Sequence, residues 1–300
     1  MFVADKGHPD KKTIEPVLKQ FTKPLMGGVF PEIIADGERR ETGFLVLPLF
    51  NKLNTVLVDL SLDVSEIKKS IHTHAQQEAV KNVSLFCITD ALTSEKTTMI
   101  DLLYDSWGPE ANYVGAGAGS LSFKPLPCII HQHTMVGNAA VIGVIDVTVN
   151  IGVAHGWAPV SEAIKVTETE GNSIISLNWE PAFDVYREQI LRHSGVEISP
   201  ENFFDVAKSY PLGLIRLDSE MTIRDPYATN NGWLHIVDNV PEGDYIRIMN
   251  GNINSLLEGA SKAFKDSHAN ISDETSQQFC VDCISRVLYM QDEFDRELAL

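Results

Sequence analysis

The stretch that decides the fold is residues 149–186, VNIGVAHGWAPVSEAIKVTETEGNSIISLNWEPAFDVY. It begins with an apolar run that ends at Val153-Ala154 and predicts a strand. This strand would lead directly into His155-Gly156-Trp157, and a polar bend containing Pro159 follows. The histidine–glycine–tryptophan sequence therefore marks the entrance to the most regular part of the chain.

The second half of this stretch predicts a hairpin followed by a helix. Residues 164–167 alternate apolar and polar side chains, as a half-buried strand does, and 173–177 predict the return strand. The turn cluster Glu170-Gly171-Asn172-Ser173 separates them. Pro181 suits the start of a helix, where its missing N–H is not needed. The apolar stripe of that helix is Phe183, Val185, Tyr186, Ile190 and Leu191.

Composition and charge exclude several classes of protein. The 300 residues contain 24 Lys and Arg against 41 Asp and Glu, which gives a net charge of −17. Such a chain repels phosphate backbones and anionic membrane surfaces, so nucleic-acid and membrane partners are not expected. The hydrophobic content of 44% and charged content of 22% are ordinary for a globular protein with a sizeable core.

The sequence predicts a cytoplasmic location. The apolar stretch 137–153 is interrupted by Asn138, Asp146 and Asn150, so we expect no membrane span. The N-terminus MFVADKGHPDKK lacks the basic-then-apolar pattern of a signal peptide. Four cysteines in a chain of this length indicate reduced thiols.

The region 1–181 predicts a degenerate internal duplication of an α/β unit. Each copy has a strand, a helix, an apolar residue before a glycine-rich turn, and an apolar strand, and Gly27 corresponds to Gly115 under a shift of 88 residues. We expect strands at 1–4, 43–50, 56–60, 83–90 and 139–145, and helices at 10–21, 65–80 and 97–106. Two such units would pack their strands into one sheet or two facing sheets, with helices outside.

The region 182–300 predicts a sheet-rich α+β arrangement. Short strands separated by turns are typical of an antiparallel sheet. Asn252 is a suitable N-cap for a long helix to Lys265, and residues 289–298 predict an acidic terminal helix. The expected strands are 213–217, 221–224, 234–237 and 245–249, after a short helix that begins near Pro200 and ends near Tyr210. The fold class is therefore α/β or α+β.

The glycine run Gly115-Ala116-Gly117-Ala118-Gly119 invites a phosphate-binding interpretation. A dinucleotide site requires a helix after the glycines, whereas here extended chain with Pro125 and Pro127 follows. Two interpretations stay open. The glycines let two backbones approach closely, or they form a loop that lines a small-ligand pocket with free amide groups.

The histidine and cysteine pairs give no metal or redox site. His131-x-His133 would place two rings on one strand face, but no third ligand is near, and His72-x-His74 lies in a predicted helix where that spacing diverges. Cys280-x-x-Cys283 is a single pair, whereas a zinc ribbon needs two. We expect no metal and no cofactor.

His155 and Trp157 can stack against a ligand and hydrogen-bond to it. The alternative is a structural corner in which Trp157 is packed and His155 is satisfied by the backbone. No nucleophile elbow G-x-S-x-G occurs in the chain. Nothing in the sequence requires an enzyme.

The chain resembles the FIST domain, a sensory and signal-transduction module, over most of its length. His155-Gly156-Trp157-x-Pro159, Glu170-Gly171-Asn172 and Pro181-Ala182-x-x-x-Tyr186 follow the family pattern in order. Further matches are Gly27-Gly28-Val29-Phe30-x-Glu32, Gly115 to Gly119, Val166-Thr167, Tyr210-Pro211-Leu212-Gly213, Arg224-Asp225-Pro226, Val240-Pro241-Glu242-Gly243 and Cys283-x-x-Arg286. The resemblance implies an N-terminal FIST region at 1–181 and a C-terminal FIST region at 182–300.

The resemblance also implies a module that binds small ligands such as amino acids and acts through signalling domains. Two departures stand out. A strand and helix expected before Phe2 are missing, and no receiver, kinase, cyclase or F-box segment is attached. Any output would then pass through a separate signalling protein. The family has no catalytic motif to transfer.

Three hypotheses result. The first is a cytoplasmic sensor that binds an amino acid or another small carboxylate, which an arginine can hold through paired hydrogen bonds. The second is an interaction module without a ligand, and the third is an enzyme that uses Cys283 or His155. For the first, the candidate ligand-binding residues are His155, Trp157, Gly115, Gly117, Gly119, Arg224, Arg286 and Cys283.

Overall fold

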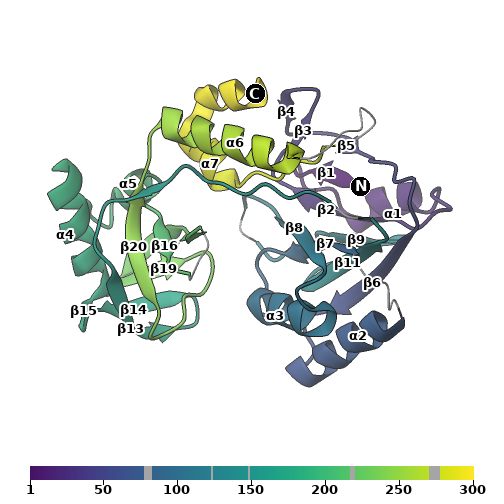
Figure 1. Cartoon of the computed structure of the whole chain (residues 1–300), viewed down its shortest axis with the longest axis horizontal. Coiled ribbons are helices and arrows are strands. Elements are labelled where there is room, and N and C mark those ends of the chain that lie inside the picture. The colour runs from purple at the N-terminus through teal and green to yellow at the C-terminus, as the bar shows by residue number, and fades with distance from the viewer. Residues whose placement is uncertain (78–82, 123, 148, 217–219, 270–277) are drawn as a thin grey trace. The chain divides into compact units, whose positions relative to one another are not determined.

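The computed structural model describes residues 1–77, 83–122, 124–147, 149–216, 220–269 and 278–300 (Figure 1). The chain divides into two compact units. The first unit consists of Met1–Ile151 and Gln278–Val281, and the second unit of Gly152–Gln277 and Asp282–Leu300. Each unit has its own hydrophobic core, so each is described by itself.

The first unit contains two larger sheets in its described residues. One sheet has the strand order β10-β9-β2-β1-β5, and the other has the order β6-β11-β7-β8. The strands of the first sheet are β1 (Phe2–Ala4), β2 (Met26–Phe30), β5 (Phe44–Leu45), β9 (Ile129–His131) and β10 (Thr134–Val136). Those of the second are β6 (Leu53–Asp59), β7 (Ser84–Asp90), β8 (Asn112–Ala118) and β11 (Ala139–Ile145), and β3 (Ile33–Ala35) and β4 (Glu38–Arg40) form a separate hairpin.

The central strand β11 shows why this unit forms layers. Its residues Ala140, Ile142 and Val144 pack in one cluster with helices α2 (Val64–Gln77) and α3 (Lys96–Trp107). The alternate residues Ala139 and Val141 pack in a second cluster with β1, β2, β9 and helix α1 (Lys11–Leu18). Because side chains alternate along a strand, an unbroken apolar run buries both faces of its sheet.

Two parallel strand–helix–strand units occur where the sequence predicts its duplication. β1 and β2 pair in parallel around α1, and β7 and β8 pair in parallel around α3. The duplication itself stays a prediction from the sequence. Phe279 also belongs to this unit, and its ring packs against Phe2 and Phe86 with centroids 5.1 and 5.2 Å apart.

Two expectations for this region need correction, and a third can be compared only in part. The strand expected at 43–50 is only Phe44–Leu45, because it pairs with β1 alone at the edge of the sheet and Pro48 lacks a backbone donor. The expected glycine turn at Gly115–Gly119 is instead extended chain: residues 115–118 form the second half of strand β8, and Gly119 directly follows it. The helix expected at 65–80 spans Val64–Gln77, and 78–80 lie outside the described residues.

The second unit is organised around one sheet of nine strands in its described residues. The order is β17-β16-β20-β13-β14-β19-β18, and β12 pairs with β20 and β15 with β14. All of these pairs are antiparallel. The strands are β12 (Ala158–Pro159), β13 (Ile164–Glu170), β14 (Ser173–Leu177), β15 (Glu180–Pro181), β16 (Leu212–Leu214), β17 (Thr222–Arg224), β18 (Pro226–Asn230), β19 (Trp233–Ile236) and β20 (Tyr245–Asn250).

The hairpin and helix predicted from residues 164–186 are confirmed. β13 and β14 pair around the turn at Gly171, which has φ +56°. Helix α4 (Ala182–Ser194) begins directly after Pro181, and its buried residues include Phe183, Val185, Tyr186 and Ile190. Leu191, the last residue of the expected stripe, is exposed. The mixed α/β fold with a sheet-rich C-terminal region is therefore also confirmed.

The helices of the C-terminal region complete the second unit. They are α5 (Phe203–Ala207), α6 (Ile253–His268), α7 (Ile284–Met290), the 3-10 turn η1 (Gln291–Phe294) and α8 (Asp295–Leu298). Asn252 caps α6 as predicted, and Ser255 returns a hydrogen bond to the Asn252 backbone in a capping box. None of the described helices has the length and apolar content needed to cross a membrane.

The strand expected before His155 is absent. Residues 149–156 have no strand pairing, and the backbone at Gly152 and Gly156 lies against α6 instead. A Cβ atom on Gly152 would stand 2.7 Å from the Ser267 nitrogen near the end of that helix. The apolar pattern predicted extended chain correctly but could not show that this chain packs against a helix and not in a sheet.

Candidate functional site

The His155-Gly156-Trp157 turn is fixed by close packing of backbones in the second unit. Gly156 has φ +75°, and a Cβ atom there would lie 2.8 Å from the Leu256 Cα of helix α6. A Cβ atom on Gly259, one turn further along α6, would lie 2.6 Å from the Gly156 nitrogen. Both positions need glycine because real Cβ contacts are not this short. The turn is therefore held at a defined place on the helix.

The His155 ring has one nitrogen that accepts a hydrogen bond and one that makes no hydrogen bond of standard geometry. The Trp157 N–H donates a 2.9 Å hydrogen bond to His155 Nδ1, so in the neutral ring the proton is on Nε2. Nε2 is buried and makes no hydrogen bond of standard geometry to the described residues, although the Met221 backbone lies close enough to favour the protonated ring. The Glu220 Oε1 atom stands 3.6 Å away, at the distance of an ion pair but beyond a hydrogen bond. His155 thus presents a fixed N–H donor beside a carboxylate.

Burial lowers the pKa of His155 below its ordinary value of 6.5. Glu220 and the Met221 backbone oppose this shift, and the positive charge of Arg286 adds to it. The ring is therefore neutral at pH 7, which agrees with its acceptance of the Trp157 N–H.

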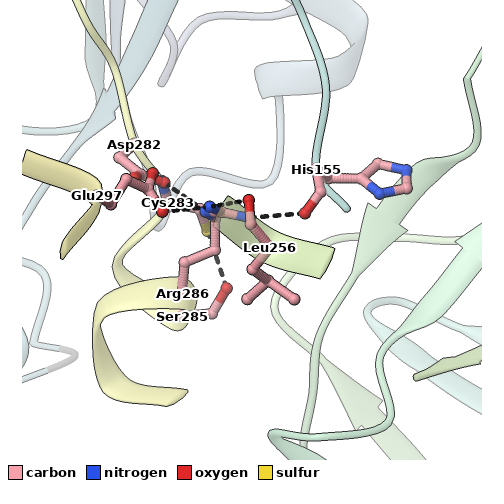
Figure 2. A network of polar contacts seen from close by, with 7 residues as sticks. All are labelled: His155, Leu256, Asp282, Cys283, Ser285, Arg286 and Glu297. Carbon is pink, nitrogen blue, oxygen red and sulfur yellow. Dashed lines mark hydrogen bonds and ion pairs between the residues drawn. The ribbon is translucent and has the colours of Figure 1, made fainter. Parts of the chain in front are cut away.

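Arg286 is the centre of a buried polar network that positions this turn (Figure 2). Its Nη1 donates to the His155 carbonyl at 2.6 Å, and its Nη2 donates to the Leu256 carbonyl at 3.2 Å. Nε is 3.0 Å from Asp282 Oδ1, and Nη2 also bonds to Glu297 Oε2 at 2.5 Å. Figure 2 shows the His155 carbonyl facing Arg286 while the imidazole points away.

This geometry makes Arg286 a positioning group. A guanidinium has five N–H bonds, and four of them are used by these contacts. The carbonyls come from the His155 turn and from α6, and the carboxylates lie before α7 and in α8. Arg286 therefore joins four separate segments of the second unit at one buried point.

The two carboxylates of this network face a single positive charge. Burial raises the pKa of Glu297 to about 8, and the hydrogen bond and negative charge of Asp282 add to the shift while Arg286 opposes it. A protonated Glu297 leaves one carboxylate for one guanidinium, which is a neutral arrangement. The folded protein therefore holds a proton on Glu297 that an unfolded chain, with a Glu pKa near 4.5, releases at neutral pH.

Glu297 gives the stability of the protein a defined pH dependence. Because the folded-state pKa of Glu297 is raised, the free energy of unfolding falls as the pH rises toward 8. We expect a loss of about 1 kcal/mol between pH 7 and 8.5, a range in which ordinary histidines no longer titrate. Urea denaturation at both pH values measures it. Glu297→Gln keeps the neutral form and should flatten the curve; parallel curves for the two proteins would contradict the assignment.

Cys283 and Arg224 lie around Asp225 in the same unit. Cys283 Sγ is 3.0 Å from Ser285 Oγ, and Ser285 in turn hydrogen-bonds to Asp225. Burial is the first cause that raises the pKa of Cys283, and the charge of Asp225 is the second. The Cys283 residue is exposed overall, yet the charge alone gives the same direction, so the thiol is protonated at pH 7. The guanidinium of Arg224 donates to the carbonyls of Ile223 and Asn239.

The remaining candidate residues have structural surroundings. Trp157 is buried, and its ring lies 5.2 Å from that of Tyr289. Gly115, Gly117 and Gly119 belong to the first unit, where a Cβ atom on Gly115 would come within 3.1 Å of the Cys87 carbonyl carbon. This contact is the close approach of two backbones that the sequence left open as one interpretation. The described residues contain no group of three or more side chains placed to bind a metal.

The sequence identified His155, Arg286 and Cys283 but not the acids around them. Asp282 stands four residues before Arg286, a spacing at which a carboxylate and an arginine meet on one helix face, so this partner was detectable. Glu297 and Glu220 are distant in sequence and carry no local pattern. Gly259 was hidden inside an otherwise regular helix.

The comparisons with known families match the whole chain. The family model described as FIST N domain matches residues 1–180, and the model described as FIST C domain matches residues 182–300. The comparisons with curated proteins and with solved structures found no match. FIST domains are associated with signal transduction and sensing. Together the two models cover almost every residue, and the chain therefore belongs to the FIST family.

Proposed function

We propose that this protein is a cytoplasmic sensory module that binds a small ligand at His155 in its second unit. The observation that carries the proposal is the buried Nε2–H of His155, which makes no hydrogen bond of standard geometry in the described residues. Buried donors are nearly always hydrogen-bonded in folded proteins, and leaving one unpaired costs about 1–3 kcal/mol. A ligand oxygen from a carboxylate or a carbonyl group is the chemical partner for this donor.

The surroundings of Nε2 favour a ligand that carries both signs of charge. Glu220 Oε1 lies 3.6 Å from Nε2 and is the charged group nearest to it in the described contacts. An ammonium group pairs with this carboxylate while a carboxylate or carbonyl oxygen accepts from Nε2–H. An amino acid offers both groups on one carbon. A simple dicarboxylate would be repelled by Glu220.

The other candidate residues have supporting roles in the proposed site. Arg286 holds the His155 carbonyl, and the Trp157 N–H sets the tautomer of the ring. Arg224 and Cys283 lie beside Asp225 in the same unit. The glycines of β8 belong to the first unit and are left outside the proposed site.

The test is a thermal-shift screen of the full chain against amino acids, short carboxylates and nucleotides, followed by calorimetry on the hits. A ligand at 100 times its dissociation constant raises the free energy of unfolding by about 2.7 kcal/mol. We expect hits among amino acids, and His155→Asn should abolish them. This variant keeps a side-chain oxygen that accepts the Trp157 N–H two residues on, but removes the Nε2 donor.

Two controls make this result specific. Glu220→Gln should weaken the binding of zwitterionic ligands more than the binding of neutral amides, because this substitution removes only a charge. His133→Asn changes an exposed histidine of the first unit and should leave binding unchanged. Full binding by His155→Asn would contradict the proposal.

The second candidate function is an interaction module that acts on a separate signalling protein without a ligand. It is favoured by exposed apolar side chains at 44–50 in the first unit, where Phe50 is 93% exposed and Phe44, Val46 and Leu49 are exposed as well. If no compound of the panel raises the thermal stability of the folded protein, this function is favoured over the sensor.

A further inference from the structure

A hollow of the second unit lies between the α5 segment and strand β18. Its volume is about 290 Å³, close to the lower end for small-molecule sites. It is lined by Pro200, Glu201, Asn202, Phe203, Phe204, Asp205, Tyr227, Ala228 and Thr229. No part of the His155 site contributes to it, so its function is a separate question.

Two aromatic rings are presented at this hollow and are not buried in the core. Phe203 is 3% exposed and forms part of the core, whereas Phe204 and Tyr227 are 48% and 47% exposed. The Tyr227 ring contacts His235, with centroids 6.3 Å apart, and has no ring contact with Phe204 in the described residues. Both rings are therefore half-exposed on the lining of one hollow.

The charges of the lining are all negative. Glu201 and Asp205 contribute carboxylates, and no lysine, arginine or histidine lines the hollow. The Ser199 side chain hydrogen-bonds to Glu201 and lowers its pKa, so Glu201 is ionised at neutral pH. Asp205 has only a loose ion pair, 3.6 Å from Lys208 Nζ, and is 82% exposed. An anion is excluded, and a cation is attracted by a chain with a net charge of −17.

Exposed aromatic faces beside carboxylates are the surroundings that suit an organic cation. The negative face of a ring attracts an ammonium group, and a nearby carboxylate adds a direct charge interaction. We propose that this hollow binds an organic ammonium group, either that of a small molecule or the side chain of a lysine in a partner. The Phe204 and Tyr227 rings contact the cation, and Glu201 and Asp205 supply the countercharge.

The test titrates the full chain with choline and with its neutral isostere 3,3-dimethyl-1-butanol, followed by nitrogen–proton NMR spectra. Choline should shift the resonances of residues 201–205 and 227–229, and the alcohol should bind at least several-fold more weakly. Tyr227→Ala and Phe204→Ala should each lower the affinity for choline by about 3- to 30-fold, the range that a cation–aromatic contact provides. Both rings are half-exposed, so both variants should fold.

Matched controls are available in the same unit. Tyr245→Ala removes a ring that is 49% exposed but does not line the hollow, and it should leave binding unchanged. The double variant Glu201→Gln with Asp205→Asn should weaken choline binding and reduce the dependence of its affinity on salt. His155→Asn should have no effect on choline binding. Failure of the proposal for the hollow is therefore distinguishable from failure of the function proposed for the His155 site.

A third titration separates the two sources of the cation. A capped tripeptide with a central lysine that binds more tightly than choline would assign the hollow to a partner's side chain, and the reverse order would assign it to a small molecule. Equal binding of choline and the alcohol would overturn the proposal. So would the absence of shifts at 201–205 and 227–229 with every probe, or undiminished choline binding by Tyr227→Ala.

Discussion

Gly156→Ala should lower the free energy of unfolding of the protein by about 2–5 kcal/mol. An L-residue at the left-handed φ of +75° costs about 1–2 kcal/mol. The added methyl group also meets the Leu256 Cα at 2.8 Å, and this overpacking costs about 1–3 kcal/mol because backbone atoms cannot rotate away. Urea denaturation followed by tryptophan fluorescence measures the loss, since Trp157, Trp179 and Trp233 are all in the second unit.

Gly195→Ala is the matched control for this variant. Gly195 ends helix α4 of the same unit with φ +72°, but a Cβ atom there would have nothing within 4 Å. The Gly195→Ala variant isolates the cost of the left-handed φ and should lower the free energy of unfolding by about 1 kcal/mol. If the two glycine variants lost equal stability, the close packing of the His155 turn on α6 would not be the cause.

Arg286→Met is expected to destabilise the protein by about 3–5 kcal/mol. The side chain is 8% exposed and joins Asp282, Glu297 and two backbone carbonyls. Removing it leaves buried polar groups without their partner, which costs far more than the loss of an exposed ion pair. The measurement is the same denaturation experiment, at pH 7.

Two further variants test why Arg286 matters. Arg187→Met breaks an exposed pair with Asp184 and should cost less than about 1 kcal/mol. Adding Asp282→Asn and Glu297→Gln to Arg286→Met should recover part of the loss, because neutral amides tolerate burial without a cation. If these additions gave no recovery, the stabilisation by Arg286 would come from packing and not from charge.

Much of the fold could be predicted from local patterns. The alternation in 164–167, the turn at Gly171 and the proline before α4 each act within a few residues, and the structure has these elements there. The apolar runs at 43–50 and 149–154 gave wrong strands because an apolar pattern does not show what packs against it. The first is mostly irregular chain beyond a two-residue edge strand, and the second lies on a helix.

The candidate site was predicted only in part. His155 and Arg286 stood out by residue type, and the structure brings them together through a 2.6 Å hydrogen bond to the His155 carbonyl. The sequence could not show that the arginine binds protein atoms with most of its N–H groups. It also could not show that Nδ1 of His155 is engaged locally while Nε2 is not. The contacts of Arg286 reach residues up to 131 positions away, whereas the Trp157 N–H that engages Nδ1 is only two residues from His155.

The most direct test of the account is the protonation state of the His155 ring in the full chain. A long-range nitrogen–proton NMR spectrum of histidine-labelled protein reports it, with the signal assigned by its loss in His155→Asn. We predict a neutral ring at pH 7 with the proton on Nε2, and a change at Nε2 when a ligand from the screen is added. A ring protonated on Nδ1, or on both nitrogens at pH 7, would contradict the account.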